Sequence, residues 1–139
     1  MRALLIGLAA LATGCGLSCT EIYAPSSIYL EVVGGDGSPG RYQLELNGYS
    51  QVAMCVVDLP AADDELISCT SNAMLTLSDD GTAIVGMLAT DFAPEGFEAT
   101  LLIDGERVAD DFYAPDYAID EPNGKNCGER KTADVTLKR

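Results

Sequence analysis

Acidic side chains in predicted loops are the groups of this sequence best suited to binding a ligand. The chain has 22 Asp and Glu against 8 Lys and Arg, and it has no histidine. Calcium prefers hard oxygen ligands of this kind. Its candidate ligands are Asp36, Asp79, Asp80, Asp116, Asp120 and Glu121. Their spacing does not match an EF-hand loop, and acids beside glycine are common turn residues. Two interpretations stay open: turns on a solvated surface, which we favour, and a calcium site.

Carboxylates placed in pairs could also act as the acid and base of a hydrolase. The candidate sets are Asp63, Asp64 and Glu65, or Asp110 and Asp111. Neighbouring side chains on a strand point to opposite faces, so Asp110 and Asp111 cannot readily share a site. The absence of histidine excludes Ser-His-Asp and Cys-His arrangements within this chain. We expect a protein that is not an enzyme, with a carboxylate hydrolase as the catalytic alternative.

The five cysteines favour disulfides over metal binding, because the sequence has neither a CxxC pair nor a histidine. If lipid modifies Cys15, an even set remains, and four cysteines allow three pairings. We favour Cys55 with Cys69, which closes a short loop. We then expect Cys19 with Cys127, which would tie the two ends of the domain together.

Tyrosines in predicted turns are the candidate binding residues, because tyrosine is enriched at binding surfaces. They are Tyr49, Tyr113 and Tyr117. A net charge of -14 argues against nucleic acid or an anionic membrane surface as the partner, since both need a positive patch. We expect an envelope protein or a glycan as the partner, and no cofactor unless the calcium alternative holds.

The N-terminus has the layout of an export signal: Arg2, then ten apolar or small residues from Ala3 to Ala12, then small residues before Cys15. The apolar run is too short to span a bilayer, which takes about 20 residues. Residues 12–15, Ala-Thr-Gly-Cys, resemble the bacterial lipobox, although the family more often has Leu at the place of Ala12. The resemblance implies a diacylated Cys15 as the new N-terminus and, since Gly16 rather than Asp follows, the outer membrane. Ordinary cleavage after Ala12, giving a secreted protein, is the alternative.

We therefore predict a signal peptide at 1–14, a lipidated N-terminus and tether at 15–27, and one domain at 28–139. Alternating apolar residues predict strands over 28–33 and 42–47, as antiparallel strands joined by the glycine-rich loop 34–40. Further strands are predicted over 50–57, 73–77, 82–88 and 132–138, with a helical turn within 59–68.

Two dipeptides predict tight hairpin turns. Asn47-Gly48 precedes the strand at 50–57, and Asp104-Gly105 lies inside a hairpin spanning Phe97 to Phe112. About seven or eight short strands, with turn signals every 8 to 12 residues, are typical of an immunoglobulin-like antiparallel β-sandwich. We expect this fold for the domain.

Several segments together resemble a group of small, uncharacterised myxobacterial lipoproteins. They are the lipobox, the turn Thr76–Gly81, the Asp-Gly hairpin, the segment Tyr113–Tyr117 and the segment Glu121–Gly128. The resemblance covers most of the chain after Gly34. Several members of the group carry another cysteine shortly after the one matching Cys127, where this chain has Arg130-Lys131. This departure leaves Cys127 to pair with Cys19. Because the group has no established activity, the resemblance implies a fold and a compartment only.

Overall fold

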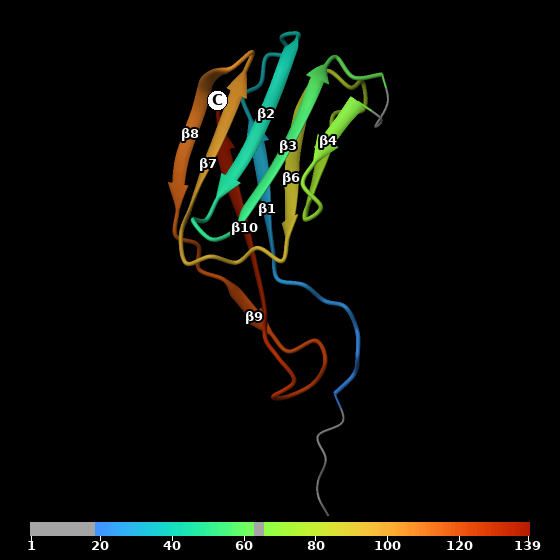
Figure 1. The fold of residues 1–139 in the computed structure, drawn as a ribbon, viewed down its shortest axis with the longest axis vertical. Coiled ribbons are helices and arrows are strands. Elements are labelled where there is room, and N and C mark those ends of the chain that lie inside the picture. The colour runs from blue at the N-terminus through green and yellow to red at the C-terminus, as the bar shows by residue number, and fades with distance from the viewer. Residues whose placement is uncertain (1–18, 63–65) are drawn as a thin grey trace, which may run out of the picture.

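The computed structural model describes residues 19–62 and 66–139, which form ten strands in two five-stranded sheets (Figure 1). The first sheet has the order β5-β6-β1-β10-β9 and the second β4-β3-β2-β7-β8. The strands are β1 (Ser27–Val33), β2 (Gly40–Asn47), β3 (Val52–Leu59), β4 (Ile67–Cys69), β5 (Ala73–Leu77), β6 (Ile84–Thr90), β7 (Phe97–Ile103), β8 (Glu106–Tyr113), β9 (Ala118–Asp120) and β10 (Arg130–Lys138). No helix in these described ranges is long and apolar enough to cross a membrane.

The two sheets face each other across one apolar core, as the alternating patterns predicted. In β2, Tyr42, Leu44 and Leu46 are buried while the residues between them are not. Phe92 and Phe97 are both fully buried and meet edge to face, with ring centroids 5.6 Å apart. Such pairs add to the stabilisation that burial of the rings provides. The all-β class and the two-sheet arrangement are confirmed, and the immunoglobulin-like assignment stays a prediction.

The strand count was underestimated, and the sheets are not purely antiparallel. The strands β4 and β9 have only three residues each, too few for a period of two to be recognised in the sequence. In addition, β1 and β10 pair in parallel, from Ser27 opposite Thr132 to Val33 opposite Lys138. A parallel pair between the first and last strands has no local turn signal, so the sequence could not indicate it.

The strands predicted at 28–33 and 42–47 exist, but they do not pair with each other. The first lies in β1, beside β6 and β10, whereas the second lies in β2, beside β3 and β7 in the other sheet. The loop between them crosses from one sheet to the other. Alternation in a strand indicates which face is buried and leaves the choice of partner to the rest of the fold.

Of the two predicted hairpin turns, one is confirmed and one is misplaced. Asp104 and Gly105 both have positive φ, 52° and 84°, as a type I′ turn requires. In the other hairpin, Asn47 pairs with Val52, so that residues 48–51 form a four-residue loop. The Asn47 side chain accepts a hydrogen bond from the Tyr49 N–H at 3.0 Å, which starts the loop with an Asx-type turn.

At both ends of the range 59–68, within which a helical turn was predicted, the chain is extended, whereas Leu66 between them has 3₁₀-helical geometry. Leu59 ends β3, and Ile67 and Ser68 belong to β4, which pairs with β3. The acids expected in the first turn, Asp63 and Asp64, lie outside the described residues.

Both predicted disulfides are present in the structure. Cys55 and Cys69 lie directly opposite each other on β3 and β4 and are linked across the two strands. Cys19 and Cys127, which are 108 positions apart, link the N-terminal segment to the loop before β10.

An arm projects from one end of the sandwich, and we define it as residues 19–26 and 118–131 (Figure 1). The Thr20 N–H donates to the Asn123 carbonyl at 3.0 Å. The Asn123 side chain accepts from the Ile22 N–H at 2.9 Å and donates to the Ile22 carbonyl at 3.0 Å. The described part of the predicted tether is thus bonded to the C-terminal part of the arm.

At the end of the sandwich opposite the arm, Gly81 in the β5–β6 loop packs closely against Ala61 in the β3–β4 loop. Its φ is 69°, and a Cβ there would lie 2.1 Å from the Ala61 carbonyl oxygen. We expect Gly81→Ala to lower the free energy of unfolding by about 1 to 3 kcal/mol, through backbone strain and this clash. Urea denaturation measures the change. Gly35→Ala is the matched control, since a Cβ there meets nothing within 4 Å. Equal stabilities of the two variants would contradict the expectation.

Candidate functional site

The three predicted tyrosines lie around the loop that joins β6 to β7. The Tyr117 hydroxyl donates a hydrogen bond to the Pro94 carbonyl. The Tyr113 ring stacks on Phe97 with centroids 5.2 Å apart, and its hydroxyl donates to the Thr136 carbonyl at 2.7 Å. Tyr49 is placed by the β2–β3 loop, which contacts the same segment. The tertiary fold therefore brings together residues from three distant parts of the sequence.

Tyr49 lines a surface hollow of about 510 Å³, which we call the Pro94 hollow. Its other walls are Pro94, Glu95 and Gly96 of the β6–β7 loop and Phe112 at the end of β8. Tyr49 and Phe112 are 87% and 57% exposed. Two large aromatic side chains thus face solvent beside a concave surface, which is the type of feature that marks interaction sites.

Close backbone contacts hold the walls of the hollow in place. A Cβ on Gly48 would lie 2.7 Å from the Pro94 ring, and a Cβ on Gly96 would lie 2.6 Å from the Phe112 ring. The Gln51 side chain also accepts a hydrogen bond from the Ala93 N–H at 3.2 Å. Glycine at these two positions allows the loops and the ring to pack together. The shape of the hollow is therefore fixed by packing between the β2–β3 loop, the β6–β7 loop and β8.

The tyrosines around the hollow have different roles. Burial raises the pKa of the Tyr117 hydroxyl, and burial followed by the nearby Asp111 charge raises the pKa of Tyr113. Both hydroxyls already donate to backbone carbonyls, Tyr117 to Pro94 of the β6–β7 loop and Tyr113 to Thr136 of β10, so these side chains join neighbouring segments. Tyr49 and Phe112 are the exposed groups. Phe112 was not among the predicted binding residues, because it ends a predicted strand and no local signal distinguishes it.

Two of the candidate calcium ligands are occupied by hydrogen bonds within their own turns. Asp36 accepts from the N–H and hydroxyl of Ser38 at 3.0 and 2.6 Å, and from Arg139 at 2.8 Å. Asp80 accepts from the hydroxyls of Ser78 and Thr82, both at 2.7 Å. Their hydrogen bonds are those expected of acids in turns.

The other candidate ligands are spread over the structure. Asp120 forms an ion pair with Arg130, and Glu121 accepts from the Asn126 N–H at 2.9 Å. Asp116 precedes β9, and Asp79 lies in the β5–β6 loop. Within residues 19–62 and 66–139, no three acidic or cysteine side chains form a group that could hold a metal ion.

Of the acids considered for a hydrolase, the structure describes only Asp110 and Asp111, and these two do not form a shared site. Asp63, Asp64 and Glu65 lie outside the described residues. Asp110 contacts Arg107 at 3.4 Å, while Asp111 accepts from the Phe112 N–H at 2.9 Å. Both are exposed neighbours on β8, whose side chains alternate between faces.

Comparison with known proteins gives no match to any family model, curated protein or solved structure. Functional inference for this chain therefore depends on its own residues. Among the described features, the Pro94 hollow combines a concave shape, exposed aromatic rings and a carboxylate at Glu95.

The hydrogen bonds within their turns lower the pKa values of the Asp36 and Asp80 carboxyl groups. Hydrogen bonds from Ser38 hold the pKa of Asp36 at about 2, and those from Thr82 and Ser78 hold the pKa of Asp80 at about 2. Because the folded-state pKa lies below the ordinary value of 3.8, both groups stabilise the fold fully above about pH 4. This stabilisation is lost as the pH falls through about 2.

Carbon-13 NMR titration of the carboxyl groups measures both values. Thr82→Val removes the side-chain donor and is expected to raise the pKa of Asp80, while Asp36 serves as the internal control. A pKa near 4 for Asp80 in the protein without the substitution would show that the hydrogen bonds from Ser78 and Thr82 do not form in solution.

Proposed function

We propose that this chain is a non-catalytic binding module of the bacterial cell envelope, anchored by lipid on Cys15. The observation that carries the proposal is the division of the five cysteines. Four of them form the two disulfides, and the remaining one, Cys15, ends the lipobox-like segment. Two acyl chains on one cysteine anchor a protein stably without a transmembrane helix.

The disulfides also support a location outside the cytoplasm, because disulfides persist in oxidising compartments. In this proposal the protein belongs to the outer membrane, as the residue after Cys15 is Gly16. The resemblance to small myxobacterial lipoproteins points to the same compartment. A high negative charge suits an exported domain that must stay soluble beside its anchor.

We further propose that the module binds an envelope glycan at the Pro94 hollow. Sugar rings have apolar C–H faces that pack on aromatic rings, and Tyr49 and Phe112 present such rings. Sugar hydroxyls donate hydrogen bonds, and Glu95 offers a carboxylate acceptor at the same surface. A few polar groups placed among apolar ones are typical of sites that orient a small ligand.

Anchorage is tested by the intact mass of the protein purified from bacterial membranes. We expect the mass of a chain that begins at Cys15 and carries acyl groups. Cys15→Ala is expected to move the protein from the membrane to the soluble fraction, with both disulfides unchanged. A mass that corresponds to cleavage after Ala12 without lipid would disprove the anchor.

Glycan binding is tested by co-sedimentation with isolated peptidoglycan sacculi. We expect the soluble Cys15→Ala chain to be retained, and Tyr49→Ala or Phe112→Ala to weaken retention by about fivefold or more, because truncating a central aromatic anchor costs more than about 1 kcal/mol. Met74→Ala is the matched control: this side chain is 61% exposed and lies on β5, away from the hollow. Retention that is absent, or that does not depend on the two rings, would refute the glycan site.

A further inference from the structure

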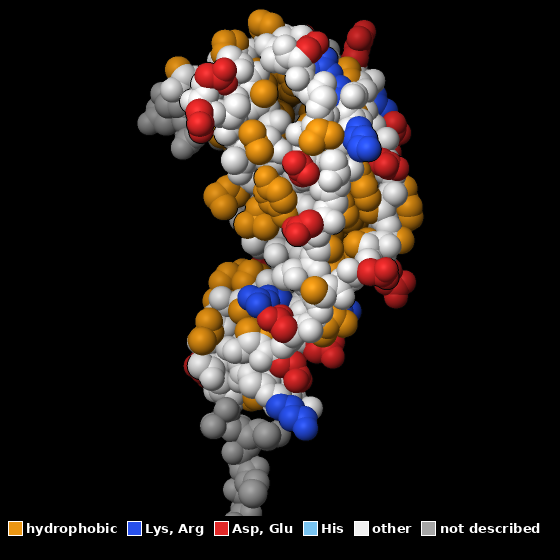
Figure 2. All heavy atoms as spheres, turned by 180° about the vertical axis from the view of Figure 1, so that it is seen from behind, with side chains coloured by type: hydrophobic (Ala, Val, Ile, Leu, Met, Phe, Trp, Pro, Cys, Tyr) orange, Lys and Arg blue, Asp and Glu red, His pale blue; other side chains and the backbone are white. Residues whose placement is uncertain are grey.

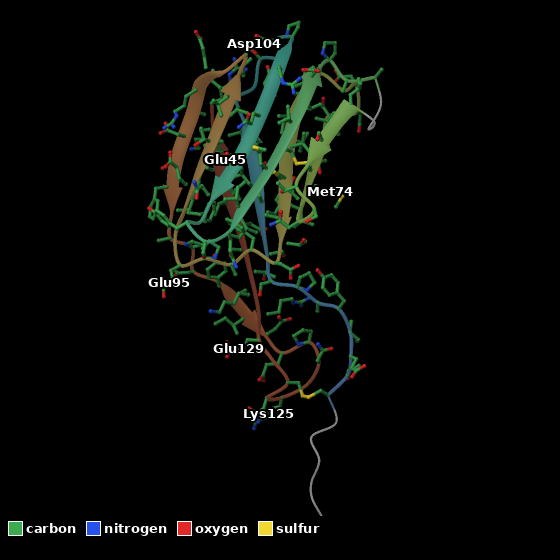
Figure 3. All side chains as sticks on the ribbon, in the orientation of Figure 1. Glu45, Met74, Glu95, Asp104, Lys125 and Glu129 are labelled. Atoms are coloured by element: carbon green, nitrogen blue, oxygen red, sulfur yellow. A yellow bond between two sulfur atoms is a disulfide. The ribbon has the colours of Figure 1, made fainter. Side chains whose placement is uncertain are left out.

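We propose that the tip of the arm, formed by Cys19 and residues 121–128, lies against the headgroups of the lipid bilayer. This inference rests on the lipid anchor proposed above and adds an orientation to it. The partner is a lipid surface, and the contact is made by a part of the molecule that lies at the opposite end from the β7–β8 turn. In Figure 3, Lys125 and Glu129 mark the arm and Asp104 marks the distant turn.

Covalent geometry limits how far the arm can lie from the anchor. Only four peptide steps separate Cys15 from Cys19. A fully extended chain covers at most about 3.6 Å per residue, so the Cα atoms of these cysteines are never more than about 14 Å apart. A lipid on Cys15 therefore keeps Cys19 close to the membrane surface in every conformation of the intervening residues.

The disulfide passes this restraint on to the C-terminal half of the arm. The Cα atoms of Cys19 and Cys127 are 5.6 Å apart. Asn123 holds the same two segments together through its bonds to Thr20 and Ile22. The loop is also closed internally, because the Gly124 N–H donates to the Glu121 carbonyl at 3.1 Å. The tip is thus one bonded unit, and it follows Cys19 to the bilayer.

The charge of the arm suits a membrane surface better than the charge of the rest of the chain does. The arm has three basic residues, Lys125, Arg130 and Lys131, against four acids, a formal charge of -1, whereas the whole chain has -14. Figure 2 shows basic side chains on the arm. Anionic headgroups repel the acidic sandwich and barely repel the arm. In addition, Ile22 on the arm is 57% exposed and offers an apolar contact.

Single tryptophan reporters test the orientation, because the chain has no tryptophan of its own. Lys125→Trp places the reporter at the tip of the arm, and Glu106→Trp places the control at the start of β8, directly after the β7–β8 turn; both positions are exposed. Each lipidated protein is reconstituted into phosphatidylcholine vesicles that contain lipids with a nitroxide on the headgroup. We expect several-fold stronger quenching at position 125 than at position 106.

The outcomes separate this inference from the proposed function. Vesicle association with equally weak quenching at both positions would overturn the orientation and leave the anchor intact. Failure of the lipidated protein to associate with vesicles would overturn both. A Cys15→Ala chain with Lys125→Trp controls for the membrane affinity of tryptophan itself. If the tryptophan at position 125 were quenched equally in the unlipidated and the lipidated protein, the inference would also be overturned.

Discussion

The parallel pairing of β1 with β10 is the constraint on which the rest of the structure depends. These strands begin and end the domain, and together they form the middle of the first sheet. Ordering the chain between them has a high entropic cost, because no short turn connects them. The Arg139 N–H extends the pairing at one end by donating to the Val33 carbonyl at 2.9 Å. At the other end the Lys131 N–H donates to the Ser26 hydroxyl at 3.0 Å, next to the arm.

The Cys19–Cys127 disulfide reinforces this pairing from outside the sheet. It closes a loop that contains nearly the whole domain, which restricts the unfolded chain where the native contacts are most distant in sequence. The Cys55–Cys69 disulfide acts locally, since it joins the neighbouring strands β3 and β4 at one edge of the second sheet. Together the bonds compensate for a sheet order that local turns alone do not determine.

The strands at the sheet edges have features that discourage pairing with another chain. β4 and β9 are short, and the pairings of β5 with β6 and of β8 with β7 contain register shifts, at Thr76/Leu77 and at Leu101/Leu102. β8 also carries exposed acids at Asp110 and Asp111. Such features protect a β-protein from edge-to-edge association. The proposed glycan site and the proposed membrane contact involve mainly the loops and the arm, although Phe112 of the edge strand β8 also lines the Pro94 hollow.

Local sequence patterns determined much of the burial pattern and one of the two predicted hairpin turns of this protein. Alternation over Tyr42–Leu46 predicted which side chains are buried, and Asp104-Gly105 predicted its hairpin, because both depend on a few neighbouring residues. The two disulfides were the favoured pairing among three that the sequence allowed. Only the tertiary structure decided that β1 and β2 belong to different sheets and that Phe112 and Tyr49 line the same hollow. These features depend on contacts between residues far apart in the chain, which no local period encodes.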